Sequence, residues 1–208
     1  MPGRGVLADE LGLLMPLLVR CPGSRACHVL PTEQAVEHAP PLLMSITTRL
    51  WCDGRGWHAA DGKVQAFPAM PALSVDLVLA MHVIAMLPEP KARLETLHRM
   101  LVPGGMAFFA EFNPWGNPGR DWRNQGVTMM SVRRLSALAV ECGFEIEASY
   151  ALCPRTSDQS SGRLLRHGWR VPAWLPLCAY AIRARKRDPG MTLVGKPLAV
   201  GLAGASGA

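Results

Sequence analysis

Polar and aromatic side chains follow two apolar segments that the sequence predicts to be buried strands. His82 comes directly after residues 75–81, and Asn113 and Trp115 come directly after residues 106–112. An imidazole can accept or donate a proton near neutral pH, and an indole ring can cover a substrate. The same residues also fit a loop histidine without chemistry and an asparagine that caps the end of a strand. They are candidates for a functional site, and no catalytic residue is assigned among them.

The cysteines carry no metal-binding pattern. There is no Cys-x-x-Cys pair and no Cys/His ligand spacing among the six, which stand at positions 21, 27, 52, 142, 153 and 178. Cysteines placed in this way are typical of small buried side chains in a reducing compartment. The sequence therefore predicts no metal site and a cytoplasmic protein.

A strand–helix–strand unit is the clearest structural pattern of the chain. Residues 75–81 form a continuous apolar run rich in Val and Leu, which suits a strand covered on both faces. Leucines then repeat at helical spacing over residues 94–101, and Pro103-Gly104-Gly105 ends the helix before a second buried strand at 106–112. Glu111, inside this second strand, lies either at the edge of a pocket or reaches solvent. Such a unit belongs to an open parallel sheet, whose ligands lie at the carboxyl ends of the strands.

The other elements alternate between strand and helix along the chain. The pattern predicts helices at 11–20, at 32–39 and after Ser131, and strands at 25–30, 42–52, 63–67, 145–152 and 177–183. Turn residues on either side of 55–60 indicate a short hairpin arm. The alternation indicates an α/β, Rossmann-like fold with a mostly parallel sheet, helices on both faces and an antiparallel C-terminal strand pair. We expect a single domain over residues 1–190, including an Arg-rich insert at 153–176, and a flexible tail over 191–208.

The net charge of +6 is concentrated towards the C-terminus. From residue 155 onward there are nine basic residues and two acidic ones. A nucleic acid would suit this charge, but aromatic residues are not interleaved with it, so a solvated basic rim is the favoured interpretation. No membrane span is predicted, because the apolar run 11–19 is too short and contains Pro16.

The middle of the sequence resembles a known family. The stretch VDLVLAMHVIAMLPEPKARLETLHRMLVPGGMAFFAEFNPW, residues 75–115, is similar to class I S-adenosylmethionine-dependent methyltransferases of the type 11 group. That family has an Asp at the start of its fourth strand, a Pro in the following loop and a helix that ends in L-x-P-G-G. The matching positions are Asp76, Pro88 and residues 101–105. Residues 142–144, CGF, are similar to the A-G-F that precedes the sixth strand of the family.

The resemblance, which runs from about residue 64 to residue 187, implies a seven-stranded sheet and S-adenosylmethionine as the methyl donor. In the family a glycine-rich turn after the first strand lets the backbone approach the amino-acid part of the donor. Here the corresponding stretch is HVLPTEQAV, without a glycine. Phe67 stands where the family has an acidic residue after its third strand. By position, the resemblance implies that the cofactor is bound by Leu30, Pro31, Thr32, Phe67, Met81 and His82, and the substrate by Asn113 and Trp115.

Two functions remain open from the sequence. One is an S-adenosylmethionine-dependent methyltransferase that acts on an unidentified small-molecule or protein acceptor. The other is a catalytically inactive protein of the same fold that acts as a binding or regulatory module, which the missing glycine turn favours. A nicotinamide-dependent oxidoreductase ranks last, because it needs its own glycine-rich turn after the first strand.

Overall fold

The structure, a computed structural model, describes residues 4–39, 41–52, 57–59, 64–65, 71–86, 89–116, 128–153, 163–167 and 179–187. Its helices are α1 (Arg4–Leu18), α2 (Glu33–His38), α3 (Pro90–Met100) and α5 (Val132–Glu141). Its strands are β1 (Arg25–Leu30), β2 (Ile46–Cys52), β3 (Trp57–Ala59), β4 (Val64–Gln65), β5 (Val75–Met81), β6 (Leu101–Phe112), β7 (Phe144–Cys153), β8 (Arg163–His167) and β9 (Ala179–Lys186). Within these ranges no helix is long and apolar enough to cross a lipid bilayer.

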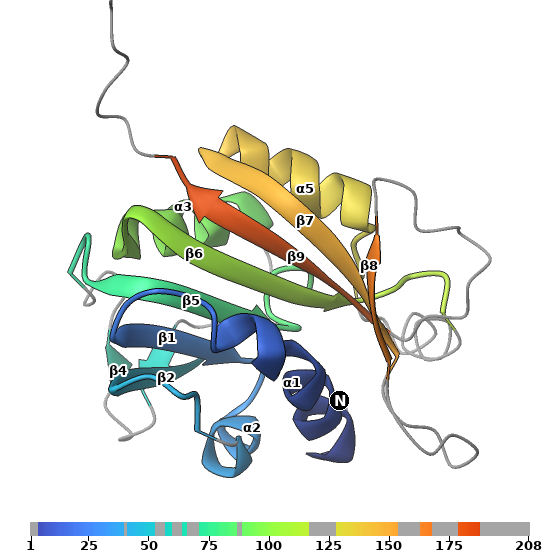
Figure 1. Ribbon diagram of the computed structural model, residues 1–208, viewed down its shortest axis with the longest axis horizontal. Coiled ribbons are helices and arrows are strands. Elements are labelled where there is room, and N and C mark those ends of the chain that lie inside the picture. The colour runs from blue at the N-terminus through green and yellow to red at the C-terminus, as the bar shows by residue number, and fades with distance from the viewer. Residues whose placement is uncertain are drawn as a thin grey trace, which may run out of the picture.

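Four parallel strands form the centre of one sheet (Figure 1). β2 pairs with β1, β1 with β5 and β5 with β6, each pair in the parallel sense. Parallel neighbours need a crossover, and α3 provides it between β5 and β6. The predicted strand–helix–strand unit is therefore confirmed, and the carboxyl ends of the four strands meet at one edge of the sheet.

Antiparallel strands extend the sheet on both sides of this centre. The order is β4-β3-β2-β1-β5-β6-β9-β7-β8, and β9 lies between β6 and β7, antiparallel to both. This confirms the predicted antiparallel C-terminal pair. The described sheet has nine strands because β3, from the predicted hairpin arm, and β4, from the predicted strand at 63–67, join one edge, and β8, from the Arg-rich insert, joins the other.

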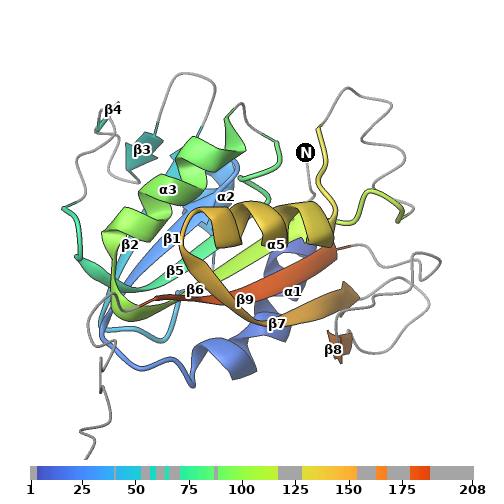
Figure 2. The same ribbon diagram turned by 90° about the horizontal axis from the view of Figure 1, so that it is seen from above.

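Helices cover both faces of the sheet, as predicted (Figure 2). One core cluster joins α3 and α5 to the sheet through the buried residues Leu94, Leu97, Met100, Leu135 and Ala139. The other joins α1 and α2 to the opposite face through Leu11, Leu14, Leu18 and Val36. Each fully buried Leu side chain contributes about 1.5–3 kcal/mol of transfer free energy, so both helix layers are firmly held.

The chain supplies clear start and stop signals for its helices. The Thr32 hydroxyl accepts a hydrogen bond from Ala35 N at 3.1 Å and caps α2, and the Ser131 hydroxyl caps α5 by accepting from Arg134 N. Gly143 follows α5 with a φ of +92°, a left-handed conformation that glycine adopts without a Cβ penalty. These boundaries agree with the sequence prediction.

Several boundaries differ from the prediction. β2 begins at Ile46 rather than at residue 42, and β9 runs from Ala179 to Lys186 rather than from 177 to 183. Two further differences have a clear physical reason. The first helix begins at Arg4 rather than at residue 11, because the apolar stripe that faces the sheet continues towards the N-terminus through Leu7. β6 begins at Leu101 rather than at residue 106, because Leu101 already pairs with Val75 of β5 across an irregular register.

A side chain of β5 forms hydrogen bonds with the backbone at the start of β1. The Asp76 carboxylate accepts hydrogen bonds from Ser24 N at 2.9 Å and Arg25 N at 3.0 Å. Gly23 precedes them with a φ of +116°, and a Cβ added there would lie 2.2 Å from the Asp76 Cβ. Asp76 is thus structural, since it joins the starts of two neighbouring strands.

Candidate functional site

The carboxyl edge of the parallel strands brings several of the predicted site residues together. Leu30 ends β1 and pairs in register with Trp51 of β2, while Met81 ends β5 beside it. His82 follows Met81 and continues the β5–β6 ladder, since its N–H donates to Ala110 O at 2.7 Å. Ligands in open α/β sheets lie at this edge, so it is the candidate site.

His82 is the most constrained side chain of the edge. Its backbone has a φ of +54°, a left-handed conformation that costs energy for any residue with a Cβ. Its ring is fully buried and stacks on Phe112, with ring centroids 3.6 Å apart and planes inclined by 11°. Its Nε2 lies 2.5 Å from Oε2 of Glu10, which is itself fully buried on α1. The sheet edge, α1 and the end of β6 thus fix one imidazole from three sides.

Glu10 was not predicted as a site residue. The signal for it is its place in the helix: it stands three residues after Leu7 and four before Leu14, within the stripe that faces the core. A carboxylate in an apolar stripe needs a partner, because burying an unpaired charge is costly. That partner, His82, lies 72 residues away along the chain.

Glu111 organises the loop that follows His82. Its Oε1 accepts hydrogen bonds from Ile84 N at 2.7 Å and Ala85 N at 3.3 Å, and its side chain is almost completely buried. Burial raises the pKa of this carboxyl to about 7, against the opposing effects of His82 and of the backbone N–H groups. Of the two interpretations that the sequence left open, solvent exposure is excluded, and the carboxyl lies inside the edge.

The turn after β1 carries side chains where a glycine-rich turn would expose its backbone. Leu30 is buried, Pro31 and Thr32 are half-buried, and the Thr32 hydroxyl is engaged in capping α2. Without a glycine, the backbone here approaches a ligand less closely than a glycine-rich turn would allow. Any ligand over β1 therefore contacts side chains rather than bare backbone.

The two predicted substrate residues lie just beyond β6. Asn113 is buried, and its Oδ1 accepts a hydrogen bond from Trp115 N at 3.2 Å, so it forms the turn that the sequence allowed as an alternative. The Trp115 side chain is 64% exposed. Phe67 lies outside the described residues.

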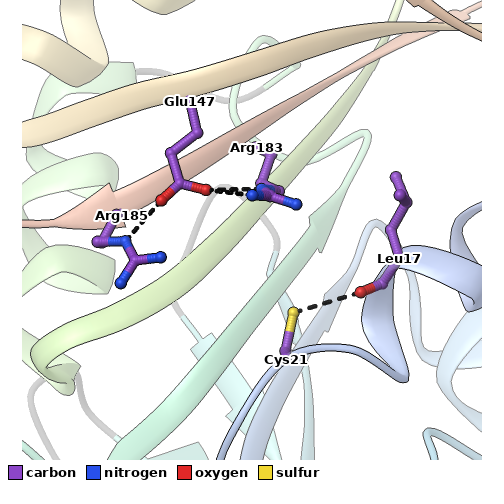
Figure 3. A network of polar contacts seen from close by, with 5 residues as sticks. All are labelled: Leu17, Cys21, Glu147, Arg183 and Arg185. Atoms are coloured by element: carbon purple, nitrogen blue, oxygen red, sulfur yellow. Dashed lines mark hydrogen bonds and ion pairs between the residues drawn. The ribbon is translucent and has the colours of Figure 1, made fainter.

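Basic side chains of β9 form an ion pair network on the face that carries α1 (Figure 3). Arg183 Nη2 lies 2.6 Å from one carboxylate oxygen of Glu147, and Arg185 Nε donates to the other at 2.5 Å. Burial acts to raise the pKa of Glu147, but the two arginines outweigh it and hold the pKa below its ordinary value. The partial neutralisation agrees with a solvated basic rim. Within the described residues there is no group of three or more His, Cys, Asp or Glu side chains that could hold a metal ion.

Comparison with solved structures shows which proteins share this fold. A Thermotoga maritima protein described as an S-adenosylmethionine-dependent methyltransferase, possible histamine N-methyltransferase, is 18% identical, with a TM-score of 0.62 over 88% of this chain and 91% of its own. An S-adenosylmethionine-dependent methyltransferase from Mesorhizobium loti is also 18% identical, with a TM-score of 0.54 over 86% and 98% of the two chains. A chain of the Haloferax volcanii complex that contains the Trm112 methyltransferase activator is 14% identical, with a TM-score of 0.56 over 86% and 92%. At these identities the likeness shows a Rossmann-like methyltransferase fold.

Comparison with protein families identifies the chain more directly. No curated protein matches the sequence. The methyltransferase domain family matches residues 5–149, which include α1, the four parallel strands, α3, α5 and the candidate site. Since this match spans more than half of the 208 residues, the chain belongs to the methyltransferase domain family.

Proposed function

We propose that the protein transfers a methyl group from S-adenosylmethionine to an acceptor, with the donor held at the carboxyl edge of β1, β2 and β5. The observation that carries this proposal is the buried polar cluster at that edge, formed by Glu10, His82 and Glu111 within the family-matched region. Methyl transfer from a sulfonium requires little beyond in-line positioning, so a rigid edge with few titratable groups is sufficient machinery.

The residues of the edge fit the charge of this donor. S-Adenosylmethionine carries a sulfonium, an ammonium and a carboxylate, so its net charge is positive, and the edge presents two buried carboxyl groups, Glu10 and Glu111. Leu30, Pro31 and Thr32 from the β1 side and Met81 and His82 from the β5 side would hold the donor. When bound, the donor supplies an electrophilic methyl group and leaves as a neutral thioether.

The reaction is proposed to take place in a reducing compartment, the cytoplasm. Three of the cysteines that the structure describes, Cys21, Cys27 and Cys142, are free thiols. Free thiols of this kind are typical of reducing compartments.

Calorimetric titration of the purified full-length protein with S-adenosylmethionine and S-adenosylhomocysteine tests the proposal. We expect saturable heat for both ligands and a rise in melting temperature, since ligands that bind only the folded state stabilise it. Absence of heat and of any thermal shift at millimolar ligand would defeat the methyltransferase proposal and leave the inactive binding module as the function.

A pair of variants at Thr32 locates the donor. Thr32→Trp and Thr32→Ala both lose the cap on Ala35 N, at a cost of about 1 kcal/mol, but only Trp adds bulk. If the donor lies over β1, Thr32→Trp should weaken binding at least about tenfold relative to Thr32→Ala, through steric exclusion. Equal affinity of the two variants would place the donor elsewhere.

A further inference from the structure

Exposed aliphatic side chains gather at the amino edge of the sheet, where the parallel strands begin and which lies opposite the candidate site. Six large hydrophobic side chains of the described residues are more than half exposed. Four of the six stand on the segments that lead into β1, β2 and β5 or at the start of β2, and these are Val19, Leu43, Ile46 and Leu73. Single exposed hydrophobic side chains are ordinary, but a group of them on one surface marks an interaction site.

Backbone contacts hold these segments next to one another. Ile46 pairs in register with Arg25 of β1, and Ile46 N donates to Ser24 O at 2.9 Å. Leu73 N donates to Arg99 O at 3.0 Å, so the end of α3 lies beside the segment that enters β5. The hydrogen bonds already described between the starts of β1 and β5 join the two halves. The exposed side chains therefore belong to one continuous edge.

Leu73 keeps an apolar side chain where its backbone disfavours one. Its φ of +56° lies in the left-handed region, which is rare for a bulky residue and which Asn or Gly adopts at lower cost. The side chain is also 54% exposed, so packing within the fold offsets only part of this cost. Strain of this kind is typical of functional positions, and here it holds a Leu side chain out towards solvent.

Four exposed arginines surround the aliphatic side chains. Arg20, Arg25 and Arg99 lie beside them in sequence or through the contacts just given. Arg187 follows β9, which ends on the same side of the molecule as β5 and β6 begin (Figure 1), and Lys186 Nζ at that end donates to the carbonyl of the α3 residue His98 at 2.8 Å. We call the following residues the amino-edge patch: Val19, Arg20, Arg25, Leu43, Ile46, Leu73, Arg99 and Arg187.

The amino-edge patch carries a net positive charge. None of its arginines forms an ion pair with another residue that the structure describes. Asp76 and Glu147, on neighbouring strands, are occupied by hydrogen bonds within the fold, while Glu145 of β7 is exposed. Four unpaired guanidinium groups against one exposed carboxylate favour an anionic partner.

The composition of the amino-edge patch distinguishes between classes of anionic partner. Proteins that bind single-stranded nucleic acids stack bases on aromatic rings, and the residues that dominate protein–protein interfaces are rich in Trp and Tyr. The patch contains no aromatic residue. An anionic lipid surface requires only apolar side chains that enter the acyl boundary and cations that contact the headgroups. Aliphatic and guanidinium groups on turns along one edge match the lipid surface best.

We propose that the amino-edge patch docks the protein on the surface of an anionic lipid bilayer, with its aliphatic side chains at the acyl boundary and its arginines at the headgroups. The inference goes beyond the proposed function and does not depend on it. Because the patch and the candidate site lie at opposite ends of the parallel strands, the docked protein holds its carboxyl edge away from the lipid. A methyl acceptor then reaches the site from the aqueous side.

Flotation of the full-length protein with lipid vesicles tests the proposal. The vesicles contain either phosphatidylcholine alone or phosphatidylcholine and phosphatidylserine in equal parts. We expect the protein to float with the mixed vesicles and to bind pure phosphatidylcholine more weakly. Binding to the mixed vesicles should fall as the salt concentration rises, because salt screens the attraction between arginines and headgroups.

Single substitutions separate the apolar and the ionic contributions. Leu73→Asn relieves the left-handed backbone, so it should keep or raise the melting temperature while vesicle binding falls about tenfold. Arg25→Gln should lower binding about fivefold and weaken its salt dependence. Val140→Asn and Arg133→Gln are the matched controls, since they alter exposed residues of α5 outside the patch, and both should bind as the wild type does. Leu43→Asn replaces Leu73→Asn if that protein does not melt cooperatively.

Four results would overturn the proposal. The first is a wild type that does not float with the mixed vesicles, and the second is a Leu73→Asn protein that binds them unchanged. The third is an equal loss of binding in the control variants, which would mean that overall charge rather than the amino-edge patch attracts the lipid. The fourth is release from the vesicles by a dT oligonucleotide or by polyglutamate at the same concentration of charge. Such release would assign the patch to a nucleic acid or to an acidic protein instead.

Discussion

Glu111 is buried where an ionised carboxylate is costly. Burial raises its pKa from 4.5 to about 7. Because the folded pKa lies above the unfolded one, the folded state holds the proton more tightly, so Glu111 stabilises the fold fully below pH 4.5 and this contribution is lost as the pH rises to about 7. Glu111→Gln, which keeps an acceptor for Ile84 and Ala85, should then be more stable than the wild type above that pH, by up to about 3 kcal/mol.

Urea unfolding at about pH 5 and about pH 8 measures this difference. The matched control is Glu145→Gln, which alters an exposed carboxyl on β7 and should leave the pH dependence of the wild type intact. A Glu111→Gln protein whose stability changes with pH as the wild type's does would contradict the expectation.

His28, in the middle of β1, is also a buried titratable group. Both of its ring nitrogens lack hydrogen-bond partners among the described residues, and burial together with the charge of Arg49 lowers its pKa to about 3. The pKa of His28 in the folded state lies below its unfolded value of 6.5, so folding favours the neutral ring. The contribution of the neutral ring to the free energy of unfolding is fully present above pH 6.5 and is lost as the pH falls towards 3. At about pH 5 this amounts to about 2 kcal/mol relative to neutral pH.

Substituting His28→Leu should remove this acid sensitivity. The change replaces unpaired polar atoms by an apolar side chain of similar size, which we expect to be neutral or stabilising by about 1 kcal/mol at neutral pH. Denaturant midpoints at about pH 5 and about pH 7 provide the measurement. Greater acid sensitivity in the variant than in the wild type would show that the ring makes a stabilising contact.

At the scale of elements, the start of β1 depends on one glycine. Gly23→Ala should destabilise the fold by more than about 2 kcal/mol, because it adds a Cβ 2.2 Å from that of Asp76 in a left-handed conformation. Gly104→Ala is the matched control: its φ of +74° is also left-handed, but no atom lies within 4 Å of the added Cβ, so only about 1 kcal/mol is expected. Thermal melts of the two proteins compare the costs, and equal losses would mean that the Asp76 contact yields without penalty.

Local signals explain which elements were predictable from the sequence. The β5–α3–β6 unit, the Thr32 and Ser131 caps and the Gly143 stop depend on residues within a few positions of each other. The structure has all of them, with only the start of β6 displaced from the predicted position. The pairing of β8 with β7 was not predicted, because a short strand from an insert is recognised only by the edge that it meets.

At the scale of the whole molecule, the candidate site was only half predictable. Met81 ends a clear strand and His82 follows it, so their place at the carboxyl edge could be expected. The place of Glu10 could not be expected, since its partner His82 lies 72 residues away along the chain. Their contact depends on how α1 packs across the sheet. The turn at Asn113 could be predicted without knowing such packing, because an Asn side chain accepts a hydrogen bond from the backbone N–H two residues further along the chain.

The contact between α1 and His82 also gives the first helix a role that its apolar stripe alone would not suggest. A substitution that removes the Glu10 carboxylate would leave the His82 ring without this partner, while the leucines of α1 would still pack on the sheet. The opening residues of the chain therefore bear on the surroundings of His82 as well as on the core.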